Sequence, residues 1–321
     1  MANIDLFLNT YDTVFSLGSN CRLAKQLQIN DVYNAKSPFD WIVCESTKNL
    51  TTQFKNNFID FFLPVNLMID KNQSEFSDTL YITDTSNGFR SLHDIRKNSI
   101  DDLYNEVYKK FQHKIKSFFT RIESGKKILF VRLLEDSDDY DAMHNLTESV
   151  NIMFPHKDIN FLYIKHNNKE LSIEIAHNIQ LLCFETNYDG INNHIEWIGN
   201  NKNWKKAFSN LKVISRKDAY LSGIETLFDG RLNGRKIVVW GMQYLFADIE
   251  RLLKQYGCDN YFAYDKELSK RYESSLRILQ NTDFLDENKP YIIINTNGFF
   301  EEIFDSLSSK GFNYLTDYYF F

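Results

Sequence analysis

Apolar runs alternate with amphipathic stretches along most of the chain, and this pattern predicts strands that are followed by helices. A short apolar run at residues 13–17 ends at Gly18-Ser19-Asn20, and the helix predicted after it carries Leu23, Ala24 and Leu27 on one face. The clearest amphipathic helix covers about 100–123, and a continuous apolar strand, KILFVRLL, follows at 127–134. Strands without alternation are typical of parallel sheets that are covered on both faces.

The same rhythm continues towards the middle of the chain. A helix at 139–153 leads to a strand at 160–164, and a weaker helix at 169–177 leads to a strand at 180–184. A strand at 195–198 then precedes a short helix around Trp204. We therefore predict an α/β fold in which helices flank a parallel sheet and the crossovers are right-handed.

A second unit is predicted to begin near Gly230. Strands are expected at 236–240, 261–264, 291–294 and 314–321, with helices after the first strand and at 299–310. The predicted architecture is thus an α/β domain over residues 1–229, which we expect to be a cysteine hydrolase or transferase domain, followed by a small Rossmann-like βαβ domain over residues 230–321.

Composition limits the classes of function. The 321 residues carry a formal net charge of −6, which argues against a nucleic-acid partner. Four widely spaced cysteines offer no paired metal-ligand spacing, and no run approaches the roughly 20 apolar residues of a membrane span. The start of the chain does not resemble a signal peptide. We expect a cytoplasmic protein with thiol cysteines, no metal and no cofactor, whose oligomeric state stays open.

The turn that ends at Cys21 is the most informative segment. A residue on a sharp turn between a strand and a helix projects from the carboxyl edge of the sheet, where α/β proteins bind ligands. The unpaired amides and the dipole of a helix N-terminus favour a thiolate, and amides near Gly18, Ser19 and Asn20 are candidates for an oxyanion hole. The alternative is a buried structural thiol, the usual state of an isolated cysteine.

A cysteine nucleophile needs a base, which is usually a histidine. His93 follows a predicted turn and precedes the long helix, and we favour it over His166, which directly follows a predicted strand. The third member of a triad stays open. Asp94 points away from His93 on an extended segment. Asp40 and Asn20 are alternatives, and Asp40 is expected to cap a turn or brace the nucleophile loop.

Four segments resemble a bacterial family of unknown function that is described as papain-like cysteine peptidases, domain-of-unknown-function family 1796. They are SLGSNCRLAKQL at 16–27, SPFDWI at 37–42, LHDI at 92–95 and ILFVR at 128–132. The resemblance covers about residues 10–210 and implies a catalytic pair that maps to Cys21 and His93. Members resemble components of surface-polysaccharide gene clusters.

A buried strand before the nucleophile helix is unusual for a papain fold. The turn is also similar to SGNH esterases with cysteine in place of serine, and to the GSCFA family, although Gly18-Ser19-Asn20-Cys21 has one extra residue. Either resemblance implies acyl or related group transfer through a covalent cysteine intermediate.

The C-terminal unit retains one glycine, Gly241, of the dinucleotide fingerprint G-x-G-x-x-G. Asp265 ends the next strand, where a ribose-binding acid would lie. We expect a degenerate Rossmann-like domain rather than a nicotinamide site. The leading hypothesis is a cysteine-dependent hydrolase or acyltransferase of surface-polysaccharide metabolism that acts on a small-molecule or glycan substrate. The alternatives are a non-catalytic binding or assembly protein, or a sugar- or nucleotide-dependent transferase that uses the C-terminal domain.

Overall fold

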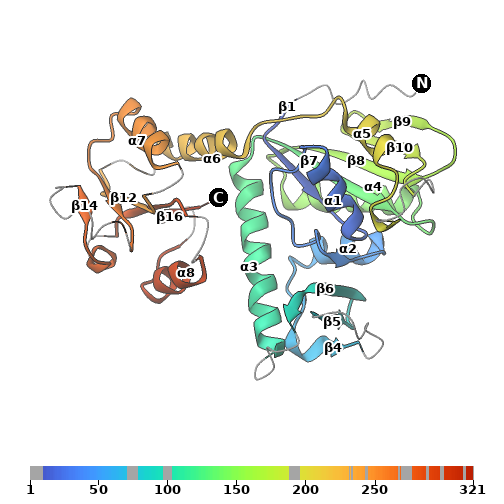
Figure 1. Cartoon of the computed structure of the whole chain (residues 1–321), viewed down its shortest axis with the longest axis horizontal. Coiled ribbons are helices and arrows are strands. Elements are labelled where there is room, and N and C mark those ends of the chain that lie inside the picture. Colours follow the sequence, from blue (N-terminus) through green and yellow to red (C-terminus); the bar gives the residue numbers. More distant parts are fainter. Residues whose placement is uncertain are drawn as a thin grey trace. The chain divides into compact units, whose positions relative to one another are not determined.

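The computed structural model describes residues 10–70, 79–96, 103–187, 196–230, 232, 234–242, 245–266, 268, 277–286, 289–296, 300–313 and 316–320. The chain forms two compact units, residues 1–214 and 215–321 (Figure 1). The division lies earlier than the boundary expected at 229/230, because α6 (Arg216–Glu225) packs its Tyr220 and Ile224 into the core of the second unit. Both units mix helices with sheets that contain parallel strands, as the sequence predicted.

The first unit is built on a five-stranded sheet of order β2-β7-β8-β10-β9. Its first four strands are parallel, and β9 pairs antiparallel with β10 at one edge. The strands are β2 (Thr13–Ser16), β7 (Lys127–Leu134), β8 (Asp158–His166), β9 (Leu171–Ala176) and β10 (Ile179–Phe184). The carboxyl ends of the parallel strands therefore meet at one edge of the sheet.

Helices cover both faces of this sheet, which explains the continuous apolar character of β7. Phe130 packs in the cluster on one face, whereas Leu129 and Val131 pack in the cluster on the other. The first face carries α2 (Thr47–Lys55), α3 (Leu103–Ser124) and α4 (Tyr140–Met153), and the second carries α1 (Cys21–Ile29) and α5 (Asn201–Phe208).

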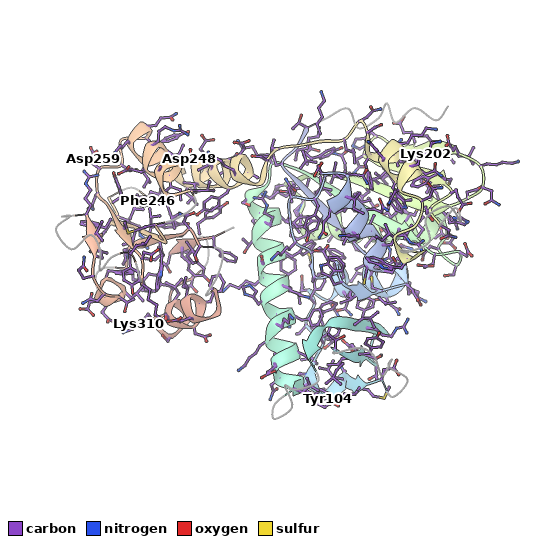
Figure 2. All side chains as sticks on the ribbon, viewed as in Figure 1. Tyr104, Lys202, Phe246, Asp248, Asp259 and Lys310 are labelled. Carbon is purple, nitrogen blue, oxygen red and sulfur yellow. The ribbon has the colours of Figure 1, made fainter. Side chains whose placement is uncertain are left out.

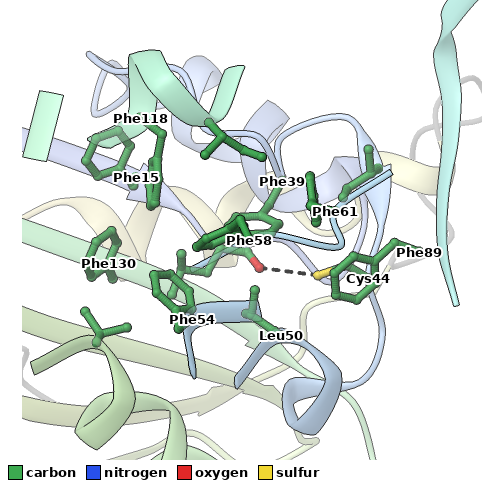
Figure 3. Packing of buried hydrophobic residues seen from close by; sticks show 14 of the residues in the cluster. Phe15, Phe39, Cys44, Leu50, Phe54, Phe58, Phe61, Phe89, Phe118 and Phe130 are labelled. Atoms are coloured by element: carbon green, nitrogen blue, oxygen red, sulfur yellow. Dashed lines mark hydrogen bonds between the residues drawn. The ribbon is translucent and has the colours of Figure 1, made fainter. Parts of the chain in front are cut away.

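Phenylalanine rings fill the first face (Figure 3). Phe39, from the SPFDWI segment, packs against Phe58, Phe61 and Phe118 with ring centroids 5.8–6.1 Å apart. Edge-on pairs at this spacing add to the free energy of apolar burial. The segment that follows the candidate nucleophile helix is thereby fixed in the core.

A smaller antiparallel sheet, order β3-β6-β5-β4, lies beside the first turns of α3 (Figure 1). The sequence did not predict this sheet. Its strands are β3 (Ile42–Val43), β4 (Leu67–Ile69), β5 (Thr79–Asp84) and β6 (Phe89–Arg96), with the short 3-10 helix η1 (Pro64–Asn66) before β4. A parallel two-stranded pair joins β1 (Thr10–Tyr11) to β11 (Lys212–Val213).

Two predicted elements are wrong. Residues 171–176 form the edge strand β9 rather than a helix, because isoleucines alternate with Ser172 and Glu174 at the period of a strand. The predicted strand at 195–198 is the 3-10 turn η2 (Glu196–Ile198), and residue 195 lies outside the described residues. The carbonyl of Ile198 accepts a hydrogen bond from the Gln26 side chain at 3.0 Å, so it needs no strand partner.

The second unit contains a fully parallel sheet of order β14-β13-β12-β15-β16. The strands are β12 (Ile237–Trp240), β13 (Tyr261–Tyr264), β14 (Ile278–Leu279), β15 (Tyr291–Ile294) and β16 (Tyr318–Tyr319). Of the predicted last strand, 314–321, two residues are strand, and residues 314, 315 and 321 lie outside the described part.

Helices again lie on both faces of the second sheet. On one face α6 and α7 (Phe246–Gln255) pack together with the 3-10 helix η3 (Thr226–Asp229), and Lys217 of α6 forms an ion pair of 2.7 Å with Asp248 of α7, labelled in Figure 2. The other face carries α8 (Phe300–Ser309) and the 3-10 helix η5 (Asp283–Leu285). Among the described residues of both units, no helix has the length and apolar character to cross a membrane.

We predict that Gly241→Ala destabilises the second unit more than Gly257→Ala. Both glycines have positive φ, so each alanine costs about 1–2 kcal/mol in backbone strain. A Cβ at Gly241 would lie 2.1 Å from the Asn295 carbonyl oxygen, whereas one at Gly257 meets nothing within 4 Å. Overpacking adds about 1–3 kcal/mol at Gly241 alone. Urea denaturation of the two variants measures the difference, and equal losses would contradict the close approach.

Candidate active site

The β2–α1 turn continues the pairing of β2 with β7. Leu17 donates its amide hydrogen to the Val131 carbonyl at 2.7 Å, and Leu133 donates to the Gly18 carbonyl at 3.2 Å. Gly18 then adopts φ +74° and Ser19 φ +90°. A positive φ at a serine is uncommon and costs free energy, so the surrounding contacts must hold this turn. The turn directs the chain away from the sheet and into α1.

Cys21 is the first residue of α1 and is partly exposed. Asn20 caps the helix, because its side chain accepts a hydrogen bond from the Arg22 amide at 3.0 Å. The predicted placement of Cys21 at the carboxyl edge of a parallel strand and the amino end of a helix is therefore observed. All four cysteines of the chain are in the thiol form.

Glu135 lies directly after β7 and contacts the turn. Its Oε1 accepts a hydrogen bond from the hydroxyl of Ser19, a residue with no exposed surface. The Ser19 carbonyl accepts a hydrogen bond from the Cys44 amide at 2.7 Å. These two contacts hold the strained residue from the side chain and from the backbone.

Arg132 of β7 holds the turn in place through hydrogen bonds from its buried side chain. Its side chain is 1% exposed and donates to the Leu17 carbonyl at 2.9 Å, to Cys44 Sγ at 3.1 Å and to the carbonyls of Cys44 and Glu45 at 2.8 Å each. Burial raises the pKa of the Cys44 thiol, and the Arg132 guanidinium opposes this effect. Cys44 is thus a buried structural thiol beneath the turn.

A carboxylate balances this buried cation through a hydroxyl. Arg132 Nε donates to Thr47 Oγ1 at 3.2 Å, and that hydroxyl donates to Asp138 Oδ2 at 2.7 Å. Asp138 also accepts the Glu135 amide at 3.1 Å. The network joins the loops after β2, β3 and β7 at the strand ends around Cys21.

Arg22, next to Cys21, extends towards the ends of β8 and β10. Its Nη1 donates to Asn187 Oδ1 at 2.8 Å, and the side-chain nitrogen Nδ2 of Asn187 lies 3.4 Å from His166 Nε2. His166 Nδ1 lies 3.3 Å from a carboxylate oxygen of Glu185. The structure therefore links His166, the less favoured base, to the residue after Cys21 through one asparagine.

His93, the favoured base, lies in strand β6, and its side chain is outside the described part of the chain. Strand β6 pairs with β3 at Ile42 and Val43, and the next residue, Cys44, bonds to Ser19. The strand that carries His93 is thus connected to the turn before Cys21 through β3 and the hydrogen bond between Cys44 and Ser19. The pairing of the His93 and Cys21 side chains stays a prediction.

Asp40 is buried and braces its own loop. Its Oδ2 accepts hydrogen bonds from the Ser37 amide at 2.8 Å and from the Tyr33 hydroxyl at 2.7 Å. Burial raises the pKa of Asp40 to about 7. These contacts agree with the turn-bracing alternative, and its carboxyl group faces its own loop rather than any described histidine.

Gly241 and Asp265, the candidates for a nucleotide site, lie at the carboxyl edge of the second sheet. Asp265 Oδ2 accepts the Met242 amide and Oδ1 accepts the Leu268 amide, each at 3.0 Å. Both carboxylate oxygens therefore already bind backbone amides, which reduces their capacity to bind a ribose. Within the described ranges, no group of histidine, cysteine or acidic side chains has the arrangement of a metal site.

Three contributors to this site were missed by the sequence analysis: Arg132, Glu135 and Asp138. The signals were present. Arg132 interrupts an otherwise apolar strand, and a charge in a buried strand requires partners. Glu135 directly follows that strand, so it had to reach the same sheet edge as the residues after β2.

Comparison with known proteins gives a family for this region. Residues 12–168 match the model of a family described as "Putative papain-like cysteine peptidase (DUF1796)". The chain is also 26% identical over 231 residues to uncharacterized protein R408 of Acanthamoeba polyphaga mimivirus, an alignment that covers 62% of this chain and 98% of that protein. No solved structure matches the chain.

We predict that Arg132→Met lowers the free energy of unfolding by about 3–5 kcal/mol, because the carbonyls of Leu17, Cys44 and Glu45 lose a buried charged donor. Arg90→Met is the matched control. Arg90 forms an exposed 3.4 Å ion pair with Glu45, and such pairs contribute about 0–1 kcal/mol. Urea denaturation of both variants decides the matter, and comparable small losses would contradict the anchoring role of Arg132.

We predict that Asp40→Asn changes how the free energy of unfolding depends on pH, because Asp40 is a buried carboxyl group with a raised pKa. Because the folded-state pKa is raised from 3.8 to about 7, protonated Asp40 favours the folded state at low pH, and this contribution is lost as pH rises through that interval. The variant should therefore gain on the wild type by roughly 4 kcal/mol over the whole interval, of which roughly 2–3 kcal/mol falls between about pH 5 and about pH 8. Urea denaturation at about pH 5 and about pH 8 measures this. A pH-independent difference between the two proteins would refute the shift.

Proposed function

Because residues 12–168 match the model of the putative papain-like cysteine peptidase family, we propose that the chain is a cysteine-dependent hydrolase or acyltransferase with Cys21 as its nucleophile. The observation that carries the proposal is the position of this thiol. It is partly exposed on the first residue of α1, after a strained turn that contacts from the loops after β3 and β7 hold in place. Strain of this kind is concentrated at functional sites.

The reaction we propose has two steps. The Cys21 sulfur attacks an acyl carbonyl and forms an S–C bond, while its proton passes to His93. His93 returns that proton to the leaving amine or alcohol as the bond to the carbonyl carbon breaks. Water in a hydrolase, or an acceptor hydroxyl or amine in a transferase, then attacks the thioester and releases Cys21.

The amides of the turn are our candidates for the oxyanion hole. The carbonyls of Gly18 and Ser19 point into the protein, where they accept hydrogen bonds from Leu133 and Cys44. Among the described residues, the amides of Ser19 and Asn20 donate no hydrogen bond to the protein. Preorganised donors of this kind stabilise the charge that develops on a carbonyl oxygen under attack.

We further propose a small-molecule or glycan substrate from surface-polysaccharide metabolism, which is what the family resemblance implies. The divergence of the helices supports a substrate at this edge, because α1 leaves β2 towards one face of the sheet and α4 leaves β7 towards the other. Ligands of α/β proteins bind at this edge.

A second candidate function is a sugar- or nucleotide-dependent transferase that uses the C-terminal unit. One observation favours it. The second sheet has its strands in the order third, second, first, fourth and fifth along the chain, which is that of doubly wound nucleotide-binding folds. In such folds the ligand lies where α7 and α8 leave adjacent strands towards opposite faces, here beside Gly241. The internal hydrogen bonds of Asp265 weigh against a ribose-bound dinucleotide.

The rate of Cys21 alkylation by iodoacetamide as a function of pH tests the proposal. We expect rapid labelling at about pH 6 in the wild type, and a roughly tenfold or greater loss in His93→Ala. Mass spectrometry separates Cys21 from Cys258, an internal reference thiol whose pKa is raised by burial. His166→Ala is the matched control, because His166 also lies near the sheet edge.

The outcomes are distinct. Slowing in His166→Ala alone would transfer the base role to His166. Labelling of wild-type Cys21 no faster than that of Cys258, unchanged in both variants, would leave Cys21 a structural thiol and favour a non-catalytic binding protein.

A further inference from the structure

The guanidinium of Arg22 is held in place at the site by neutral oxygens. Its Nε donates to the Trp197 carbonyl and its Nη1 to Asn187 Oδ1, each at 2.8 Å. Its side-chain stem passes over Gly199, where an added Cβ would lie 3.3 Å from Arg22 Cδ. The side chain is therefore half-buried and positioned rather than free in solvent.

Arg22 has fewer hydrogen-bond partners than Arg132 and Arg235. Arg132 makes five hydrogen bonds, and Arg235 makes four, of which one is the 3.0 Å ion pair to Asp317. Arg22 makes two side-chain hydrogen bonds, and no carboxylate among the described residues lies within ion-pair distance. Three of its five N–H donors are thus available to a ligand.

The charge of Arg22 is also incompletely balanced. Burial lowers the pKa of Arg22, and the nearby Glu135 carboxylate opposes this without forming an ion pair. Glu135 already accepts the Ser19 hydroxyl. A partly desolvated cation with unused donors gains most from an anion that binds it directly, because guanidinium binds carboxylate and phosphate through paired hydrogen bonds.

We propose that Arg22 binds an anionic group of the substrate, a carboxylate or a phosphate, close to the acyl carbon that Cys21 attacks. This inference rests on the proposed function, because it takes Cys21 as the reacting atom. Glu135 acts on the charge of Arg22 and also accepts the hydroxyl of Ser19, two residues before Cys21, so the guanidinium lies at the same end of α1 as the thiol. Trp197, whose carbonyl binds Arg22 and which is 48% exposed, is a candidate to border the same group.

A pair of alkylating reagents of nearly equal size tests this without a known substrate. Iodoacetate carries a carboxylate and iodoacetamide does not, so the ratio of their rates at Cys21 reports the recognition of an anion. We expect Arg22→Gln to lower the iodoacetate-to-iodoacetamide ratio roughly three- to tenfold. Lys25→Gln is the matched control: it removes a positive charge from the same helix, three residues after Arg22, and should leave the ratio unchanged.

Binding of acetate and of inorganic phosphate, followed by NMR shifts of the α1 amides, separates the two anions and does not depend on thiol reactivity. An unchanged ratio in Arg22→Gln, with anion binding unaffected, would overturn the role of Arg22. A wild-type Cys21 that reacts no faster than Cys258 would instead refute the proposed function, and loss of anion binding in Arg22→Gln would still support this site.

Discussion

The buried guanidinium of Arg132 is the constraint on which the candidate site depends. A cation in the middle of an apolar strand is tolerated only when its donors are filled. Arg132 fills them with the carbonyls of Leu17, Cys44 and Glu45, with Cys44 Sγ and with the Thr47 hydroxyl. Those acceptors belong to the loops after β2 and β3 and to the first residue of α2. The need of one buried cation for hydrogen-bond acceptors therefore determines how these two loops are placed at the carboxyl ends of the strands.

The same requirement explains how an unfavourable turn persists. Gly18 and Ser19 both adopt positive φ, and for serine this conformation is stable only if neighbouring contacts compensate. The compensation comes from the Cys44 amide, which the Arg132 network positions, and from Glu135, whose own amide is held by Asp138. Removing any of these contacts loosens the segment that presents Cys21. The geometry of the thiol is thus a property of the network rather than of α1 alone.

Local periodicity was sufficient to predict most of the parallel strands and the long helices, because one buried stripe or one continuous apolar run defines each of them. It failed where short elements depend on distant partners. Strand β9 needs β10 to form, and the sheet of β3 to β6 joins segments some fifty residues apart in sequence. For the site, the turn at Cys21 could be predicted because strand, turn and helix are contiguous. The contact of Ser19 with Glu135 spans 116 residues, which no local pattern reveals.

Two arginines near the turn have contrasting environments, and the contrast indicates a structural role for Arg132 and a ligand-binding role for Arg22. Arg132 is sealed, and each of its three side-chain nitrogens has a partner in the protein. Arg22 is fixed on one edge by Asn187 and Trp197, while its remaining donors meet no acceptor in the described part of the chain. A rigid arginine with unused donors is already oriented for an anion, so little side-chain entropy is lost on binding. A nucleophile held by the first arginine and an anion-binding group supplied by the second would make the site selective for acyl groups that carry negative charge.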